Sequence, residues 1–275
     1  MFHFVSTIGG GIRMFEKNKN PQILSSVSNA LRILKSFSTF EPTKRVSELS
    51  ESLGLAKSTV SRLLSTLAHE GFVEKNKKTG AYKLGLSVLT LGGIVTNELE
   101  IHKEASPVMN KLVIDTGETA HLSILDGHDT IYIHKEECNH PVRILTHLGR
   151  KNPAYCTSSG KVLLAFHERD LIEEIIKQGL RKYTKNTITN PEKLREELEL
   201  IRKRGYAIST EELTEGTRSV SAPIRNFTGK VVSAINVVGP IQRMKDYKIP
   251  DIAKKVVQAG EEASQRMGYD KRFLG

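Results

Sequence analysis

Apolar residues recur with helical spacing in two short segments of the first quarter of the chain. Positions 46, 49 and 53 form one group, and positions 60, 63, 64 and 67 form another with the i, i+3, i+4, i+7 spacing of a single helix face. Gly54 stands between them, where the end of a helix favours a left-handed residue. The pattern predicts a helix-turn-helix over residues 45–71.

The segments on either side extend this prediction to a winged helix-turn-helix domain over residues 22–85. Residues 26–40 predict a helix with Val27, Leu31, Leu34 and Phe37 turned inward. After residue 71, two short strands at 72–76 and 81–84 flank a polar tip. Gly80 supplies the positive φ that such a hairpin needs.

A connector with two helical patterns follows. Leu86, Leu89, Ile94 and Leu99 mark a first piece over 86–99, which Gly92 and Gly93 interrupt. A second piece opens at Ser106–Pro107 and closes at Gly117. These residues alone are compatible with two core helices of one domain or with a separate dimerisation helix over 86–99.

The remainder, residues 100–272, alternates between strand and helix patterns. Strands are expected at 118–125, 130–136, 142–146, 206–210, 218–225 and 230–238, and helices at 169–178, 191–204 and 250–267. The turns at 126–129 and 226–229 each join two of these strands as a hairpin. The pattern predicts an α+β protein whose second domain has a central antiparallel sheet.

Charge is concentrated where the helix-turn-helix lies. The chain of 275 residues has a formal net charge of +10, and residues 1–90 contain 13 Lys and Arg against 6 Asp and Glu. The second helix of the motif also begins with small polar or basic residues, as a helix entering the major groove requires. The candidate DNA-binding residues are Lys57, Ser58, Thr59, Ser61 and Arg62 in this helix and Lys75, Lys77 and Lys78 in the wing.

The segments SVSNALRILKSF, LGLAKSTVSRLLSTL and AYKLG resemble the IclR family of bacterial transcription regulators. The resemblance covers about residues 22 to 272. It implies a GAF-like α/β effector domain over 100–272, a dimerisation helix over 86–99 and a homodimer or dimer of dimers. The implied function is sequence-specific binding of a double-stranded DNA operator, as a repressor in preference to an activator, under control of a small-molecule effector.

The stretch from Cys156 to Lys161 carries the candidate effector chemistry. Small hydroxyl residues at a helix start leave backbone N–H groups free for an anion, although an ordinary N-cap has the same pattern. The resemblance makes this stretch one wall of the effector pocket, so the effector is expected to be a small organic acid. The expected pocket residues are Cys156, Thr157, Ser158, Ser159 and Gly160, with Ser209, Ser219, Asn236 and Val238 opposite. Asn236 and Val238 depart from members that bind very small carboxylates.

Other reactive residues have ordinary interpretations. Cys138 and His140, with His121 and His134 on expected strands, do not have the spacing of a zinc site, so we expect no metal and no cofactor. Lys161 is a charge partner or a surface residue, and residues 211–215 form a structural or solvated acidic turn. The alternative function is a small-metabolite enzyme or sensor that uses Cys156, with the winged helix as a protein-interaction module.

We expect a cytoplasmic protein, and we expect no enzyme, because no His or Asp near Cys156 in the sequence completes a triad. No apolar run approaches the ~20 residues that span a bilayer, and residues 1–21 are expected to be a disordered extension rather than a signal peptide. Two cysteines in a chain of this length do not make a disulfide framework, which suits a reducing compartment.

Overall fold

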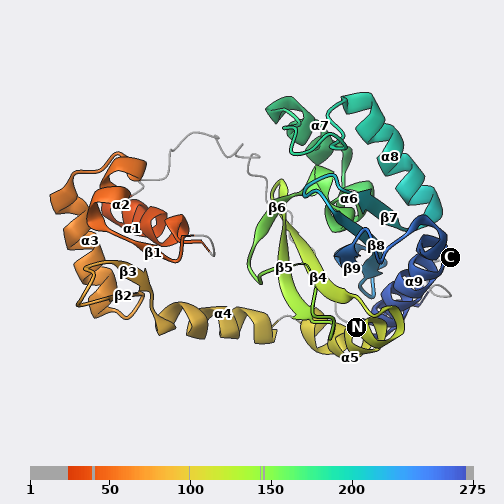
Figure 1. Ribbon diagram of the computed structural model, residues 1–275, viewed down its shortest axis with the longest axis horizontal. Helices are drawn as coiled ribbons and strands as arrows, with labels where there is room; N and C mark the ends of the chain where they lie inside the picture. Colours follow the sequence, from red (N-terminus) through yellow and green to blue (C-terminus); the bar gives the residue numbers. More distant parts are fainter. Residues whose placement is uncertain (1–23, 39–40, 99, 143, 145, 271–275) are drawn as a thin grey trace, which may run out of the picture. The chain divides into compact units, whose positions relative to one another are not determined.

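The computed structural model describes residues 24–270 except 39, 40, 99, 143 and 145, so the expected extension over 1–21 and Leu99 lie outside the described residues. The chain divides into two compact units between Thr90 and Leu91. Figure 1 shows the elements of each unit. None of the helices in the described ranges has the length and apolar character that crossing a membrane requires.

The N-terminal unit is a winged helix-turn-helix. Its elements are α1 (Ser25–Ser36), β1 (Thr43–Lys44), α2 (Val46–Leu53), α3 (Lys57–His69), β2 (Val73–Lys75) and β3 (Tyr82–Leu84). Gly54 ends α2 in the left-handed conformation, and Gly80, with φ of 70°, closes the wing hairpin. The predicted motif and wing are confirmed. The two-residue strand β1, which pairs with β3, was too short to predict.

The first helix differs from its prediction in phase and length. Val27 and Leu31 are 53% and 51% exposed, whereas Ile33 is completely buried among the residues of α2 and α3. Leu34 and Phe37 are partly buried against the same core. The helix ends at Ser36 rather than at residue 40. Because Ile33 points inward, its side chain fills the centre of this small core.

The connector forms helices in other places than expected. Helix α4 (Leu86–Glu98) continues through Gly92 and Gly93, and α5 (Glu100–Thr116) contains Pro107 in its interior. The predicted helix start at Ser106–Pro107 is therefore wrong. Residues of α5 on both sides of the proline are buried in the core of the second unit, and this burial outweighs the ~3 kcal/mol cost of an internal proline.

The C-terminal unit is built on a six-stranded antiparallel sheet in the order β6-β5-β4-β9-β8-β7 (Figure 1). Its strands are β4 (Thr119–Asp126), β5 (Asp129–Glu136), β6 (Lys151–Pro153), β7 (Ala207–Thr210), β8 (Thr217–Arg225) and β9 (Val231–Pro240). The predicted antiparallel sheet is confirmed. The strand expected near 142–146 is wrong at its described positions, and β6 is the edge strand instead.

Helices cover both faces of this sheet. They are α6 (Ser158–Ala165), α7 (Arg169–Gln178), α8 (Pro191–Arg204) and α9 (Ile249–Arg266), with short 3-10 turns at Ala154–Cys156 and Asp246–Lys248. Helices α5 and α9 pack on one face, where Leu122, Val220, Ile235 and Val237 are buried. Helix α6 packs on the other face and α8 packs on α6. Each face of the sheet is thus covered by its own layer of helices.

The corrected phase of α1 has a direct test. Replacing Ile33 with Ala empties a completely buried position and should lower the free energy of unfolding of the N-terminal unit by about 2–5 kcal/mol. Replacing the exposed Leu31 with Ala should change it by less than about 0.5 kcal/mol. Urea denaturation of the two variants separates these values, and equal losses would contradict the observed phase.

Candidate functional site

The outer face of α3 presents the residues expected to read DNA. Val60, Leu64 and Leu67 are buried against α1 and α2, which turns the opposite side of the helix outward. The five predicted residues of this side, Lys57, Ser58, Thr59, Ser61 and Arg62, are all exposed. Among the described residues, none of their side chains has a hydrogen-bond or ion-pair partner. The helix therefore offers free donors and acceptors to a ligand.

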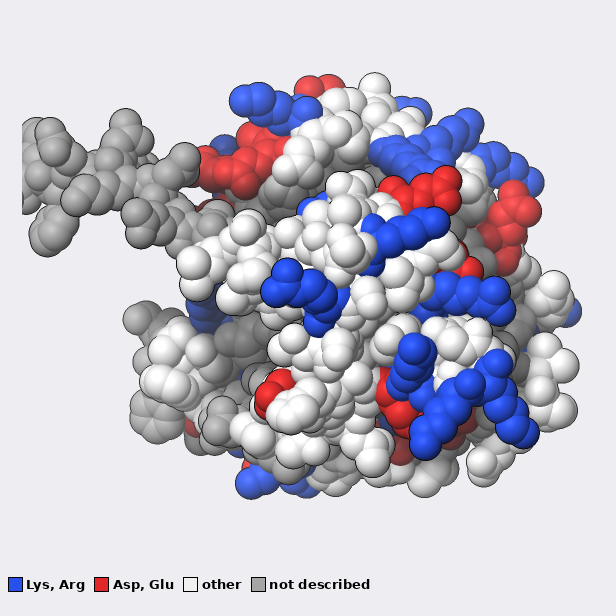
Figure 2. Space-filling model, turned by 90° about the vertical axis from the view of Figure 1, so that its left-hand side faces the viewer, with Lys and Arg blue, Asp and Glu red and all other residues white. Residues whose placement is uncertain are grey.

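The wing carries the three predicted lysines on its exposed surface. Lys75 lies 5.5 Å above the ring of Tyr82, and Lys77 and Lys78 lie at the hairpin tip. An open groove of about 730 Å³ runs along the wing, and Arg45 and Lys83 are among its lining residues. In the space-filling view, basic side chains gather in clusters with fewer acidic ones between them (Figure 2). Arg45 was missed because only strand β1 brings it beside the wing.

In the C-terminal unit, the sheet face under α6 is polar although it is buried. Strand register places alternate residues of β4, β7, β8 and β9 on this face. Its members are Thr119, His121, Ser123, Ala207, Ser209, Ser219, Ser221, Ala234, Asn236 and Val238. A buried sheet face normally consists of apolar residues, so this composition indicates a function other than packing.

The four residues predicted on the strands all belong to this polar face. Ser219 pairs with Ser209 on one side and with Val238 on the other, and Asn236 lies two residues further along β9, on the same face. His121 of β4 is directly opposite Asn236. The structure thus brings together strand residues that are up to 117 positions apart in the sequence.

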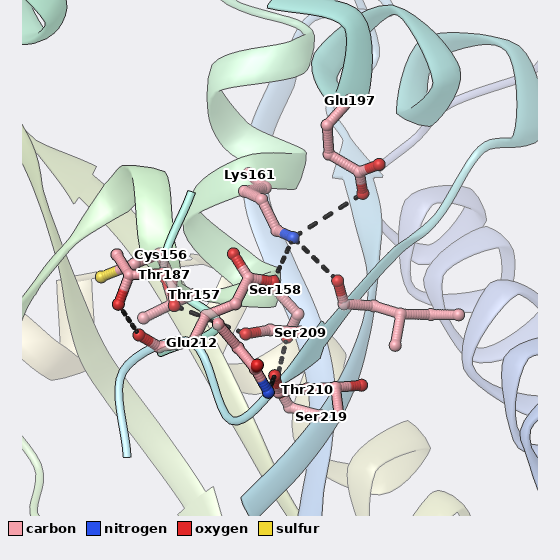
Figure 3. A network of polar contacts seen from close by, with 12 residues as sticks. Cys156, Thr157, Ser158, Lys161, Thr187, Glu197, Ser209, Thr210, Glu212 and Ser219 are labelled. Carbon is pink, nitrogen blue, oxygen red and sulfur yellow. Dashed lines mark hydrogen bonds and ion pairs between the residues drawn. The ribbon is translucent and has the colours of Figure 1, made fainter. Parts of the chain in front are cut away.

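The start of α6 lies directly over this polar face (Figure 3). Ser158 Oγ donates to Ser219 Oγ at 2.8 Å, and Ser209 Oγ donates to the carbonyl oxygen of Cys156 at 3.4 Å. Thr157 caps the helix, since its Oγ1 accepts from the Gly160 N–H at 3.1 Å. The two predicted walls are therefore in contact.

Three polar atoms on this face have no hydrogen-bond partner among the described residues. They are His121 Nδ1, Ser123 Oγ and Asn236 Oδ1, and their residues are 0%, 0% and 2% exposed. Buried polar atoms are almost always hydrogen-bonded, because losing water without a replacement is unfavourable. Three such atoms on one face require partners from outside the protein, which a buried water, an ion or a ligand supplies.

Both units of the chain match known protein families. Residues 94–265 match the family described as bacterial transcriptional regulator IclR C-terminal, and residues 26–77 match the IclR helix-turn-helix domain. The chain belongs to the IclR family of transcriptional regulators. Members of this family are helix-turn-helix regulators of transcription.

Individual relatives agree along almost their whole length. The transcriptional regulator KipR of Bacillus subtilis (strain 168) is 34% identical, over 92% of this chain and 99% of its own. The transcriptional repressor IclR of Escherichia coli (strain K12) is 28% identical, over 89% and 90%. The crystal structure of Thermotoga maritima IclR has a TM-score of 0.71 and 32% identity, over 89% and 99%.

In this IclR-family chain His121 is held as a neutral ring. Burial, with Lys135 and His134 nearby, lowers its pKa from 6.5 to about 3. The ring stacks on Tyr132 with centroids 4.5 Å apart, and Nε2 lies 2.5 Å from Thr146 Oγ1. Nδ1 has no hydrogen-bond partner among the described residues. Sequence alone offered no signal, because nothing local distinguishes His121 from a core histidine.

The other histidine and cysteine side chains that were weighed as metal ligands have local partners. His134 Nε2 lies 2.8 Å from Glu136 Oε1, and Thr119 Oγ1 donates to Cys138 Sγ at 3.4 Å. Within the described ranges, no group of three His, Cys, Asp or Glu side chains is placed to hold a metal ion.

Cys156 is unsuited to nucleophilic chemistry. Its side chain is completely buried, and this burial, with the charge of Glu212, raises the pKa of the thiol to about 12. A nucleophilic cysteine needs a low pKa, because the thiolate is the reactive form. The geometry thus argues against the alternative of an enzyme that uses Cys156.

Of the two expectations for Lys161, a charge partner or a surface residue, the surface position is wrong. It is 1% exposed, and its Nζ donates to Glu212 Oε1 at 2.6 Å and to the Ile208 carbonyl oxygen at 2.8 Å, with Glu197 at 3.6 Å (Figure 3). Glu212 is itself 6% exposed, so of the two expected alternatives for the acidic turn, structural or solvated, this residue is structural. The buried pair fixes α6 to the end of β7.

Gly160 has a packing role in addition to its predicted place in the effector loop. A Cβ at this residue would lie 2.1 Å from the carbonyl oxygen of Ala154, so only glycine permits the close approach of α6 to the preceding 3-10 turn. The start of α6 is thereby fixed on three sides, by Gly160, by the Ser158–Ser219 bond and by the Lys161–Glu212 pair.

The neutral state of His121 predicts a pH dependence of stability. The unfolded ring takes up a proton below pH 6.5, whereas the folded ring stays neutral down to about pH 3, so acid favours unfolding in this window. His121 should contribute up to about 1.4 kcal/mol per pH unit to the fall in unfolding free energy between pH 6 and 4. His121→Phe should flatten the curve measured by urea denaturation. An unchanged slope would contradict a buried neutral ring.

Proposed function

We propose that this protein is a cytoplasmic, dimeric repressor that binds a double-stranded DNA operator and responds to a small organic acid. The observation that carries the proposal is the pairing of two features in one chain. The free outer face of α3 is suited to a major groove, and the unpartnered polar atoms beneath α6 are suited to a small ligand. The protein requires no cofactor or catalytic residue for this role.

The DNA contacts divide into two kinds. Arg62 and Lys57 on α3 are placed to reach base edges, and a bidentate Arg–guanine contact gives ~1–3 kcal/mol of discrimination between bases. Lys75, Lys77 and Lys78 on the wing are suited to phosphates, which add affinity without sequence choice. The groove beside Arg45 and Lys83 extends this phosphate-binding surface.

Helix α4 supports a dimer as the reading unit. Leu86, Leu89, Leu91 and Ile94 are between 50% and 79% exposed, which is unusual for four apolar residues of one helix. A second copy of the chain is the occupant we propose for these residues, because two-fold pairing would present two recognition helices to half-sites ~34 Å apart. A dimer of such dimers remains compatible with this arrangement.

Effector control is proposed to act by a shift between two populations of the dimer. A ligand that prefers one arrangement of the recognition helices changes operator affinity by its differential binding, typically ~1–3 kcal/mol. The name of the Escherichia coli relative, a transcriptional repressor, supports repression as the output. An organic acid is supported by the start of α6, whose free N–H groups favour an anion.

DNA binding is tested by charge removal on two surfaces. Arg62→Ala and Lys57→Ala should weaken binding to a DNA fragment that contains the operator, called the promoter fragment below. They should also relax the sequence preference of the protein, since they remove base contacts. In a triple variant, Lys75, Lys77 and Lys78 of the wing are all replaced with Ala. The slope of the logarithm of the binding constant against the logarithm of the salt concentration should then become less steep by about 0.9 for each phosphate that the wing no longer neutralises. Gel retardation at several salt concentrations measures both. Lys177→Ala on α7 is the control, and equal effects in the control and in Arg62→Ala would exclude α3 as the reading helix.

The dimer is tested on its proposed interface. Leu89→Glu should place a charge in the apolar interface, convert the dimer to monomer in analytical ultracentrifugation and reduce operator affinity at least tenfold. Ile114→Glu on α5 is the matched control, because Ile114 is 81% exposed, similar to Leu89 at 72%. A dimer that survives Leu89→Glu, with the fold intact, would show that α4 is not the interface.

A further inference from the structure

We propose that Gly71, Gly85 and Ser87 clamp the end of α3 to the start of α4, so that the two helices move as one body and the protein accepts one spacing of its half-sites. The α3–α4 clamp consists of residues 70–72, Gly85 and Ser87, all within the N-terminal unit. The inference rests on the proposed dimer, which reads DNA through α3 and pairs through α4. It names the residues that convert this pairing into a choice between operators.

Helix α3 ends in a glycine cap that turns the chain sharply. Gly71 has φ of 74°. The N–H of Phe72 donates to the Leu67 carbonyl oxygen at 2.8 Å, and that of Gly71 donates at 3.1 Å to the next carbonyl along the chain. This is the Schellman arrangement, in which a left-handed residue closes a helix. It leaves the carbonyl group of Glu70, at the helix end, for another partner.

The start of α4 supplies that partner, although residues 70–85 separate it from α3 in the sequence (Figure 1). Ser87 Oγ donates to the Glu70 carbonyl oxygen at 3.1 Å, and the Ser87 N–H donates to the Gly71 carbonyl oxygen at 3.3 Å. The N–H of Gly85 donates to the Phe72 carbonyl oxygen at 2.8 Å. Three consecutive carbonyl groups are thus held. The negative end of one helix dipole also meets the positive end of the next.

The two segments lie so close together that position 85 admits no side chain. A Cβ at Gly85 would lie 2.1 Å from the carbonyl oxygen of Gly71 and 3.1 Å from the carbonyl carbon of Phe72. These are backbone atoms, so they cannot turn aside as a flexible side chain can. A Cβ at Gly71 would lie 2.7 Å from Ser87 Oγ. Bonds at three successive residues fix the orientation of α4, and a contact without free volume leaves no room for a hinge.

A small swing at this junction would change which DNA the dimer fits. Helix α3 has 13 residues and is therefore ~20 Å long. A swing of roughly 10° about its end would move its start by ~3.5 Å, which is about one base-pair step of DNA. A dimer that pairs through α4 can therefore reject a spacing that is wrong by one base pair only if the junction is stiffer than this. The α3–α4 clamp supplies that stiffness.

The spacing selectivity of the full-length protein tests the proposal. The probes are the promoter fragment and two derivatives, in which one base pair is inserted or deleted midway between the half-sites, as located by footprinting. Fluorescence anisotropy measures the affinity for each probe. The spacing penalty is the affinity for the unchanged fragment divided by that for a derivative. Wild type should show a penalty of at least tenfold.

Two hydroxyl groups of α4 provide a matched pair of variants. Ser87→Ala removes the bond to Glu70 and places a strong helix former in α4, and it should lower the spacing penalty at least threefold. Thr90→Ala is the control, because Thr90 Oγ1 donates within α4, to the Leu86 carbonyl oxygen at 3.3 Å. It should keep the wild-type penalty.

Both variants should remain dimers in analytical ultracentrifugation and bind a fragment with a single half-site as wild type does, because the α4 interface and the outer face of α3 are unchanged. A general loss of structure would lower all three properties together. Gly85→Ala, which forces the two segments apart, should lower the spacing penalty further than Ser87→Ala. The result with Ser87→Ala decides the test if Gly85→Ala does not fold.

Failure of this inference is distinguishable from failure of the proposed function. The proposal is overturned if the penalty of Ser87→Ala is less than threefold below the wild-type value, or if Thr90→Ala lowers it equally. A wild type that binds the derivatives as tightly as the promoter fragment also overturns it, while DNA binding stands. If wild type does not bind the promoter fragment at all, the proposed function itself is wrong.

Discussion

The requirement that buried polar atoms find partners organises the C-terminal unit. The sheet face beneath α6 is polar and closed to water, so each of its side chains must be paired within the protein or by something that enters. Ser219 and Ser209 are paired with α6 and with the turn before it, and these bonds hold the helix in place. On this face, His121, Ser123 and Asn236 keep atoms without a partner among the described residues, and Oε2 of the buried Glu212 is a fourth such atom. The face thus has a part that positions α6 and a part that we propose for a ligand.

The same strand connects this site with the helix that follows the connector. His121 and Ser123 of β4 face the site, whereas Ala120 and Leu122 face the opposite way and pack in the core with α5. A ligand that moves β4 therefore acts on a helix that comes directly after α4 in the chain. Closely packed cores transmit such displacements because they contain little free volume. This is a physical route for coupling that does not require contact between ligand and DNA.

The parts of the structure that were predictable are those with local signals. The helix-turn-helix, the wing and five strands of the sheet follow from apolar spacing and from glycines at turns. The phase of α1 at Ile33 and the continuation of α5 through Pro107 were missed, because tertiary burial decides both. The ion pair of Lys161 with Glu212 joins residues 51 positions apart, and no local sequence pattern predicts it. Likewise, the resemblance to known regulators predicted residues of this polar face, but only the register of β4 and β9 places His121 opposite Asn236.

The central claim is that the unpartnered polar face controls DNA binding. Fluorescence anisotropy of a labelled operator fragment tests it most directly, on wild type and on Asn236→Leu, with and without the small organic acid that binds the protein most tightly in calorimetry. The account predicts that the acid changes the operator affinity of wild type by roughly 5–150-fold. The variant should bind the operator equally well without the acid and show no response to it. A wild type that ignores the saturating acid, or a variant that responds as strongly as wild type, would contradict the account.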